Sequence, residues 1–127
     1  MSYKYQICGF NLLSQIKLPT LRKIDFEKPD FEIILKNDIQ IANKTIEVLE
    51  GGDVLFKDLH QNIFKISYQK IYISIKDNKY NEVANSVLGV PLGYLLQNND
   101  FQVLHGSAVT KNKLGYSFIG KSGIGKS

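Results

Sequence analysis

Hydrophobic and polar residues alternate most regularly in the middle of the chain. In the runs NIFKISYQ (62–69) and KIYISIKD (70–77), every second residue is apolar and the residues between them are mostly polar. A period of two is typical of strands that bury one face. Because the two runs are adjacent, we expect an antiparallel pair with a turn near Gln69 and Lys70. This turn lacks the Asn-Gly dipeptide that would define its register.

Shorter apolar runs predict further strands nearer the start of the chain. YKYQICGF (3–10) and FEIILKN (31–37) are rich in aromatic and β-branched residues, and we expect one strand in each. The stretch between them, residues 16–30, holds two prolines and mixed charges, which indicates a loop or an edge segment. Residues 44–59 predict two short extended pieces separated by a Gly-Gly-Asp turn at 51–53.

The pattern changes to a helical one after residue 79. In YNEVANSVLGVPLGYLLQNND (80–100), apolar pairs recur at a four-residue step, which places them on one stripe of a helix over residues 80–97. Asp77 or Asn78 is the expected cap. Pro91 cannot donate a hydrogen bond to the preceding turn, so we expect a kink there or a restart with this proline in the first turn.

Two more apolar runs follow the helix. FQVLHGSAV (101–109) and LGYSFIG (114–120) predict short strands joined by the polar TKNK. The natural boundary lies near residues 98–100, so the chain divides into a β-rich module with one helix, residues 1–100, and a second part, residues 101–127. The predicted fold class is α+β.

Composition supports a folded core and excludes several protein classes. The chain has 127 residues, of which 43% are hydrophobic and 22% charged, close to globular averages. No apolar run approaches the 18 residues of a membrane span, and the start lacks the apolar core of a secretory signal. Cys8 is the single cysteine and is expected to be buried on a strand. These features predict a cytoplasmic protein with no membrane contact.

The net charge of +4 is concentrated at one end of the chain. Residues 1–100 carry all 12 acidic residues and 12 of the 16 basic ones, whereas residues 101–127 carry four lysines and no acid. An excess confined to this segment suits an anionic ligand better than a nucleic acid, which would need a basic stripe across the protein. The alternative is modest clustering in a lysine-rich chain.

The last eight residues, GKSGIGKS, match the phosphate-binding P-loop pattern G-x-x-x-x-G-K-[ST]. Glycines let the backbone turn its N–H groups toward phosphates, the lysine contacts phosphate oxygens, and the serine hydroxyl ligates Mg²⁺. The run LGYSFI supplies the strand that must precede such a loop. The alternative is a flexible Gly/Ser/Lys tail. The predicted nucleotide-binding residues are Gly120, Gly123, Ile124, Gly125, Lys126 and Ser127.

The stretch LHGSAVTKNKLGYSFIGKSGIGKS (104–127) resembles the HPr kinase/phosphorylase family. In that family a His-Gly on one strand precedes a second strand and a loop very similar to this one, and here His105 lies 15 residues before Gly120. The opening YKYQICGFNLLSQIKLP and the helix before VLHGSAV look more like the HPr-kinase-like proteins of peptide-modification clusters, including lasso-peptide kinases. The likeness is specific over residues 101–127 and looser over residues 1–100.

The resemblance implies an ATP-dependent kinase that phosphorylates a serine of a protein or peptide, with ATP and Mg²⁺ as cofactors. It places Lys126 and Ser127 at the phosphates and Mg²⁺, and His105 near the phosphates. The alternative for His105 is a strand-end histidine with a satisfied hydrogen bond. The family's catalytic aspartates would follow Ser127, so we expect an N-terminal fragment of the kinase: the two strands and P-loop of an incomplete α/β domain, a poor kinase by itself.

Two other functions remain open from the sequence. The chain could be a non-catalytic module that binds a peptide or partner along a sheet edge and keeps a vestigial P-loop. It could also belong to another P-loop class, such as a GTPase or a transporter ATPase. In the isolated chain we expect the two strands of residues 101–120 to leave an apolar face and a strand edge uncovered, which favours poor solubility or dimerisation. His60 is expected to be exposed.

Overall fold

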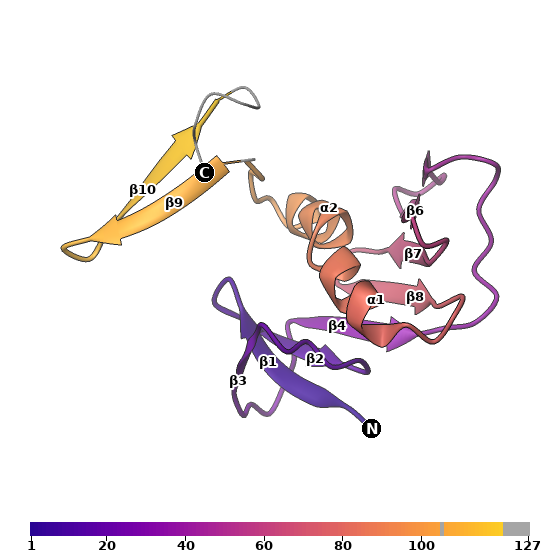
Figure 1. Cartoon of the computed structure of the whole chain (residues 1–127), viewed down its shortest axis with the longest axis horizontal. Coiled ribbons are helices and arrows are strands. Elements are labelled where there is room, and N and C mark those ends of the chain that lie inside the picture. Colours follow the sequence, from indigo (N-terminus) through magenta and orange to yellow (C-terminus); the bar gives the residue numbers. More distant parts are fainter. Residues whose placement is uncertain (105, 121–127) are drawn as a thin grey trace.

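The computed structural model describes residues 1–104 and 106–120, and most of them belong to one mixed sheet of eight strands (Figure 1). The spatial order is β3-β1-β2-β4-β8-β7-β6-β5, and neighbours are antiparallel except for the parallel pairs β2–β4 and β4–β8. In chain order the strands are β1 (Tyr3–Ile7), β2 (Phe10–Ser14), β3 (Arg22–Lys23), β4 (Phe31–Leu35), β5 (Ile46–Val48), β6 (Val54–Lys57), β7 (Ile63–Ile66) and β8 (Lys70–Ser74).

The predicted hairpin in the middle of the chain is confirmed. Strands β7 and β8 pair antiparallel, with Phe64 opposite Ile73 and Ile66 opposite Ile71. All four of these side chains are buried, whereas the polar residues that alternate with them face outward. The Gly-Gly turn between β5 and β6 is also confirmed, because Gly51 and Gly52 both adopt the positive φ that glycine tolerates best.

Two short helices cover one face of this sheet (Figure 1). They are α1 (Tyr80–Val87) and α2 (Val90–Asn98), where one helix over 80–97 was expected. The break falls at Gly89, and Pro91 lies in the first turn of α2, so the predicted restart at the proline is the observed one. The expected cap is wrong: Lys79 occupies the N-cap of α1 and no side chain caps the helix.

The core forms between the helices and the covered face of the sheet. Its buried residues all come from positions 5–95, and none comes from the last two strands. The deepest of them, each no more than 1% exposed, span both layers: Leu18, Phe64, Ile66, Ile71, Ile73, Val83, Val87 and Leu95. Residues 1–98 therefore contain a complete sheet-and-helix layer pair, as the α+β prediction requires.

The N-terminal hairpin differs from the expectation of a single strand over residues 3–10. The chain turns at Cys8 and Gly9, both with positive φ, and β1 then pairs with β2. Cys8 is exposed in this turn, so its predicted burial on a strand is wrong. The aromatic-rich run continues through the turn without an Asn-Gly signal, which is why the sequence suggests one uninterrupted strand.

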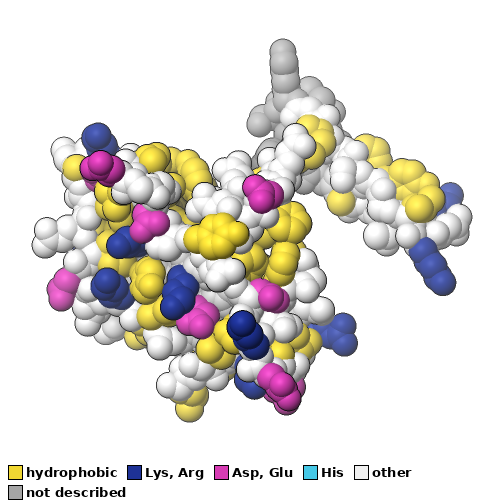
Figure 2. Space-filling view, turned by 180° about the vertical axis from the view of Figure 1, so that it is seen from behind, with side chains coloured by type: hydrophobic (Ala, Val, Ile, Leu, Met, Phe, Trp, Pro, Cys, Tyr) yellow, Lys and Arg dark blue, Asp and Glu magenta, His cyan; other side chains and the backbone are white. Residues whose placement is uncertain are grey.

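The last described strands form a separate two-stranded sheet. β9 (Gly106–Lys111) and β10 (Leu114–Ile119) pair antiparallel through a tight turn at Asn112 and Lys113. Figure 1 shows this hairpin standing away from the body of the molecule. Its larger apolar side chains are about half exposed, between 48% and 60%, and Figure 2 shows them along the hairpin surface. The predicted uncovered apolar face is thus present among the described residues.

Candidate functional site

The structure places the entrance of the predicted P-loop but not the loop itself. Gly120 is partly exposed and directly follows β10, so the strand that a P-loop requires is present. The other predicted site residues lie outside the described part of the chain: His105, Gly123, Ile124, Gly125, Lys126 and Ser127.

The register of the hairpin brings the two ends of the candidate site together. Gly106, the residue after His105, pairs with Ile119, the residue before Gly120. A Cβ atom added to Gly106 would lie 2.5 Å from the backbone oxygen of Phe118, closer than real Cβ contacts come. Glycine is therefore required where the two strands approach most closely, and this close approach is what sets His105-Gly106 beside the strand that enters the loop.

The lysines of the C-terminal segment do not all gather at this end of the hairpin. Lys111 and Lys113 flank the turn, at the opposite end from Gly120, and Figure 2 shows basic side chains at the hairpin's far tip. Five residues of strand separate the two ends by about 17 Å. Two of the four lysines therefore add little to a phosphate site at Gly120, since exposed charges at that distance are strongly screened by salt.

No described carboxylate is arranged as a catalytic pair or metal ligand set. Among residues 1–104 and 106–120, no group of three or more His, Cys, Asp or Glu side chains could hold a metal ion. Asp25 has a pKa below its usual value because it accepts a hydrogen bond from Lys4 at 2.9 Å and lies beside that positive charge. A carboxylate held ionised by an exposed lysine is a surface ion pair rather than a general base.

The sequence did not point to a polar cluster in the loop between β6 and β7. The buried Asp58 carboxylate accepts hydrogen bonds from the backbone N–H groups of His60 and Asn62 and from the Asn62 amide. Asn62 in turn accepts from the backbone N–H of Lys76. The only signal in the sequence is an Asp followed four residues later by Asn between two apolar runs, a pattern typical of side chains that organise a turn.

His60 extends this cluster toward α1. The histidine is about half exposed, as expected, and its Nδ1 lies 3.4 Å from Oε2 of Glu82. That oxygen is shielded from solvent and has no hydrogen-bond partner among the described residues. The contact is an ion pair only when His60 is protonated. It fixes the loop against the helix, and nothing in its geometry supplies a nucleophile or a second acid.

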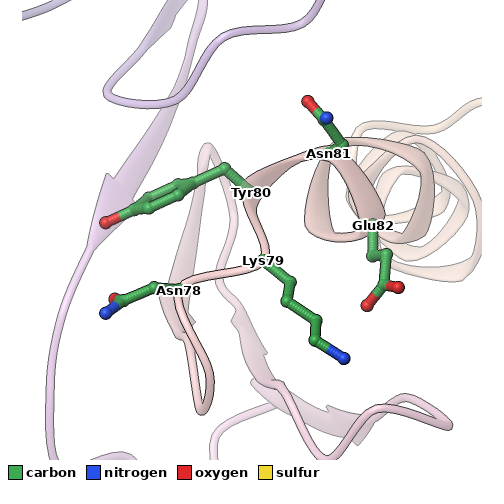
Figure 3. A pocket seen from close by; sticks show the side chains of 5 residues that line it. All are labelled: Asn78, Lys79, Tyr80, Asn81 and Glu82. Atoms are coloured by element: carbon green, nitrogen blue, oxygen red, sulfur yellow. The ribbon is translucent and has the colours of Figure 1, made fainter.

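A hollow at the start of α1 is lined by five consecutive residues, 78–82, and has a volume of about 410 Å³ (Figure 3). Their side chains diverge: Asn78 and Tyr80 point to one side, Lys79 and Glu82 to another, and Asn81 points away. Because a binding site needs polar groups that converge on one point, this hollow is not a built site.

In comparisons with known proteins, no family model, no curated protein and no solved structure matches this chain. None of the helices in the described residues is long and apolar enough to cross a bilayer. The likeness to HPr kinases therefore stays a hypothesis that rests on the motif residues of the last 24 positions.

Proposed function

We propose that this chain is the N-terminal part of an ATP-dependent, HPr-kinase-like serine kinase that acts on a protein or peptide. The observation that carries the proposal is the geometry of the β9–β10 hairpin. β10 runs directly into Gly120, and its partner strand begins at Gly106, paired with Ile119. This strand-to-loop arrangement is the context that a P-loop needs, and the lysine and serine that close the motif follow it in sequence.

The residue types of the loop fit a nucleoside triphosphate with Mg²⁺. Glycines at 120, 123 and 125 permit close approach of backbone N–H groups to phosphate oxygens, and the backbone of Ile124 lies between them. Lys126 would neutralise charge on the β- and γ-phosphates, and the Ser127 hydroxyl would ligate Mg²⁺. ATP supplies the phosphoryl group, and Mg²⁺ neutralises charge on it. His105 would lie near the phosphates because its neighbour pairs with the strand that enters the loop.

The proposal requires carboxylates that the described part of the chain does not offer. Phosphoryl transfer to serine needs an acid that ligates Mg²⁺ and a base that accepts the hydroxyl proton. Asp58 is held by three N–H donors within the module, and Asp53 accepts from Ser67 and faces Lys65. Both are structural residues, so the kinase chemistry depends on residues beyond this set.

The first test is the reading frame that encodes the segment. Downstream of the codon for Ser127 we expect an amphipathic helix and then an apolar strand that ends in aspartate. Sequence without that pattern in any frame contradicts the proposal. In protein expressed from the full frame, Lys126→Ala is expected to abolish binding of a fluorescent ATP analogue with Mg²⁺, whereas Lys121→Ala, a change at an unconstrained loop position, is expected to preserve it. Equal binding by both variants also contradicts the proposal.

A second candidate is a non-catalytic module that binds a peptide or protein partner. The observation that favours it is the completeness of residues 1–98, whose core contains no residue of the hairpin. Under this function the P-loop is vestigial. Tight binding of ATP with Mg²⁺ by the 127-residue chain, measured by isothermal titration calorimetry, would refute this candidate.

A further inference from the structure

Strand β5 forms one outer edge of the eight-stranded sheet, and its free side offers backbone hydrogen-bonding groups. β5 pairs only with β6, in the register Ile46–Phe56, Glu47–Leu55 and Val48–Val54. The Lys57 N–H donates to Thr45 and the Leu49 N–H donates to Asp53. Because an antiparallel ladder alternates, the odd-numbered positions face β6, and the N–H and C=O groups of Ile46 and Val48 point outward.

The side chains of the same two residues leave an apolar strip uncovered. Ile46 and Val48 lie opposite Phe56 and Val54, so they are on the sheet face that the helices cover elsewhere. The helices do not extend over β5, and Ile46 and Val48 are 41% and 68% exposed. Both the backbone and the side chains of this edge are therefore available to a partner.

A cleft of about 460 Å³ adjoins the start of this strip. Thr45 and Phe56 line its side nearest β5, Leu59 lines the loop side, and Gly89 and Val90 line the helix side. Leu59 and Val90 are exposed, so the lining is largely apolar at the mouth. A volume of this size accommodates one or two apolar side chains.

The charge of β5 selects among possible occupants. Glu47 lies between the two outward positions, with its side chain on the other face of the sheet. A second copy of this chain, paired symmetrically so that Ile46 meets Val48, would place Glu47 directly against Glu47. Like charges at directly opposed strand positions are destabilising. A peptide with lysine or arginine at that position gains an attractive pair instead.

We propose that β5 is a docking edge for an extended peptide segment of the pattern apolar–basic–apolar. The main chain of the peptide pairs with Ile46 and Val48, its basic residue lies opposite Glu47, and a larger apolar side chain two residues further on enters the cleft beside Leu59. This inference deepens the second candidate function, on which it rests, by naming the surface and the class of peptide. It does not depend on the P-loop and is compatible with the kinase proposal.

The opposite edge of the sheet is a poor alternative. β3 has only two residues, Arg22 and Lys23, both charged and exposed. A short, charged edge strand is a common device against edge pairing. The edge at β5 lacks that protection at Ile46 and Val48.

The experiment titrates two synthetic probes, acetyl-GTVKVTLG-amide and acetyl-GTVEVTLG-amide, into the ¹⁵N-labelled 127-residue chain and follows amide shifts by NMR. The lysine probe is expected to bind about fivefold more tightly than the glutamate probe, with shifts centred on β5. Glu47→Lys is expected to reverse this preference. The matched control Glu50→Lys, an equal charge change in the adjacent exposed turn, is expected to leave it unchanged.

A second variant tests the backbone contact. Val48→Pro removes an outward N–H without removing a bond to β6, a position at which edge strands tolerate proline. It is expected to raise the Kd of both probes about tenfold, whereas Val48→Thr changes it less than about twofold. Circular dichroism and thermal melting confirm that each variant is folded.

Four results would overturn the inference: no binding of either probe, an unchanged preference in Glu47→Lys, unchanged affinity in folded Val48→Pro, or shifts centred elsewhere. Selection from a random phage-displayed peptide library separates the two levels of the argument. Selected peptides that bind away from β5 overturn the inference and keep the peptide-binding candidate. No selected peptide at all overturns both.

Discussion

Replacement of Asn62 by alanine should destabilise the module strongly, because this side chain joins two parts of the fold. Asn62 is 2% exposed, donates from its amide to Asp58 Oδ2 at 3.0 Å, and accepts from the Lys76 N–H at 3.1 Å. The first bond involves an ionised acceptor and the second satisfies a partly buried backbone donor. In Asn62→Ala both partners lose a bond and water cannot fully replace it.

The magnitude follows from these two bonds. A hydrogen bond to a charged group contributes about 1.5–3 kcal/mol, and an unsatisfied backbone donor costs about 1–2 kcal/mol. We therefore expect Asn62→Ala to lower the free energy of unfolding by about 3 kcal/mol. With an m-value near 1.5 kcal/mol/M, the midpoint of urea denaturation should fall by about 2 M.

Urea denaturation followed by far-UV circular dichroism measures this change, and two variants control it. Asn81→Ala removes an exposed amide from α1 and should change stability by less than about 0.5 kcal/mol. Gln61→Gly, in the same loop, relieves a positive φ of 67° and should be neutral or slightly stabilising. A loss below about 1 kcal/mol in Asn62→Ala would refute the view that this amide holds the loop.

Four further outcomes are expected. Tyr5→Phe leaves the buried N–H of Leu18 without the acceptor it now has at 3.0 Å, and should cost about 1–3 kcal/mol by the same urea assay. Gly106→Ala places a Cβ against the partner strand and should raise amide exchange rates across β10 about tenfold or more. The stability that the lowered pKa of Asp25 provides is present above pH 3.8 and is lost as the pH falls through the lowered pKa, and Asp25→Asn or Lys4→Met should remove this pH dependence. The exposed β9–β10 face should make the isolated chain self-associate, and a monodisperse monomer by light scattering would contradict that.

Local chemistry made part of the fold predictable. The alternation in β7 and β8, the glycine turn after β5 and the restart of the helix at Pro91 each depend on residues within a few positions, and each is confirmed. The Cys8 turn and the uncapped start of α1 were mispredicted because neither carries its usual residues. In both places tertiary packing supports a conformation that the local sequence does not favour.

The order of the strands could not be derived in the same way. β2 pairs in parallel with β4, and β4 pairs in parallel with β8 across more than 30 residues of intervening chain. Such pairings depend on which apolar faces meet in the core, and hydrophobic periodicity fixes faces but not neighbours. The edge position of β5, which carries the docking inference, follows only from that order.

The candidate nucleotide site was predicted from residue types and spacing alone, and the structure adds only the hairpin that leads to it. The hairpin shows why two features far apart in sequence belong together, since Gly106 and Ile119 are cross-strand neighbours. It also limits the charge argument, because Lys111 and Lys113 lie at the distant turn. The case for phosphate binding therefore depends on the loop's glycines, Lys126 and Ser127 rather than on the basic character of the whole segment.

The docking edge and the P-loop are on different parts of the molecule, and this separation makes the two proposals complementary. A kinase that acts on a peptide gains from holding the substrate at a second surface, because tethering converts encounter with the reactive site into an intramolecular step at an effective concentration near the millimolar range. β5 and the β9–β10 hairpin share no strand pairing, so binding at one does not require rearrangement at the other. Variants at Glu47 should therefore change which peptide binds, and variants at Lys126 should change nucleotide binding without altering that preference.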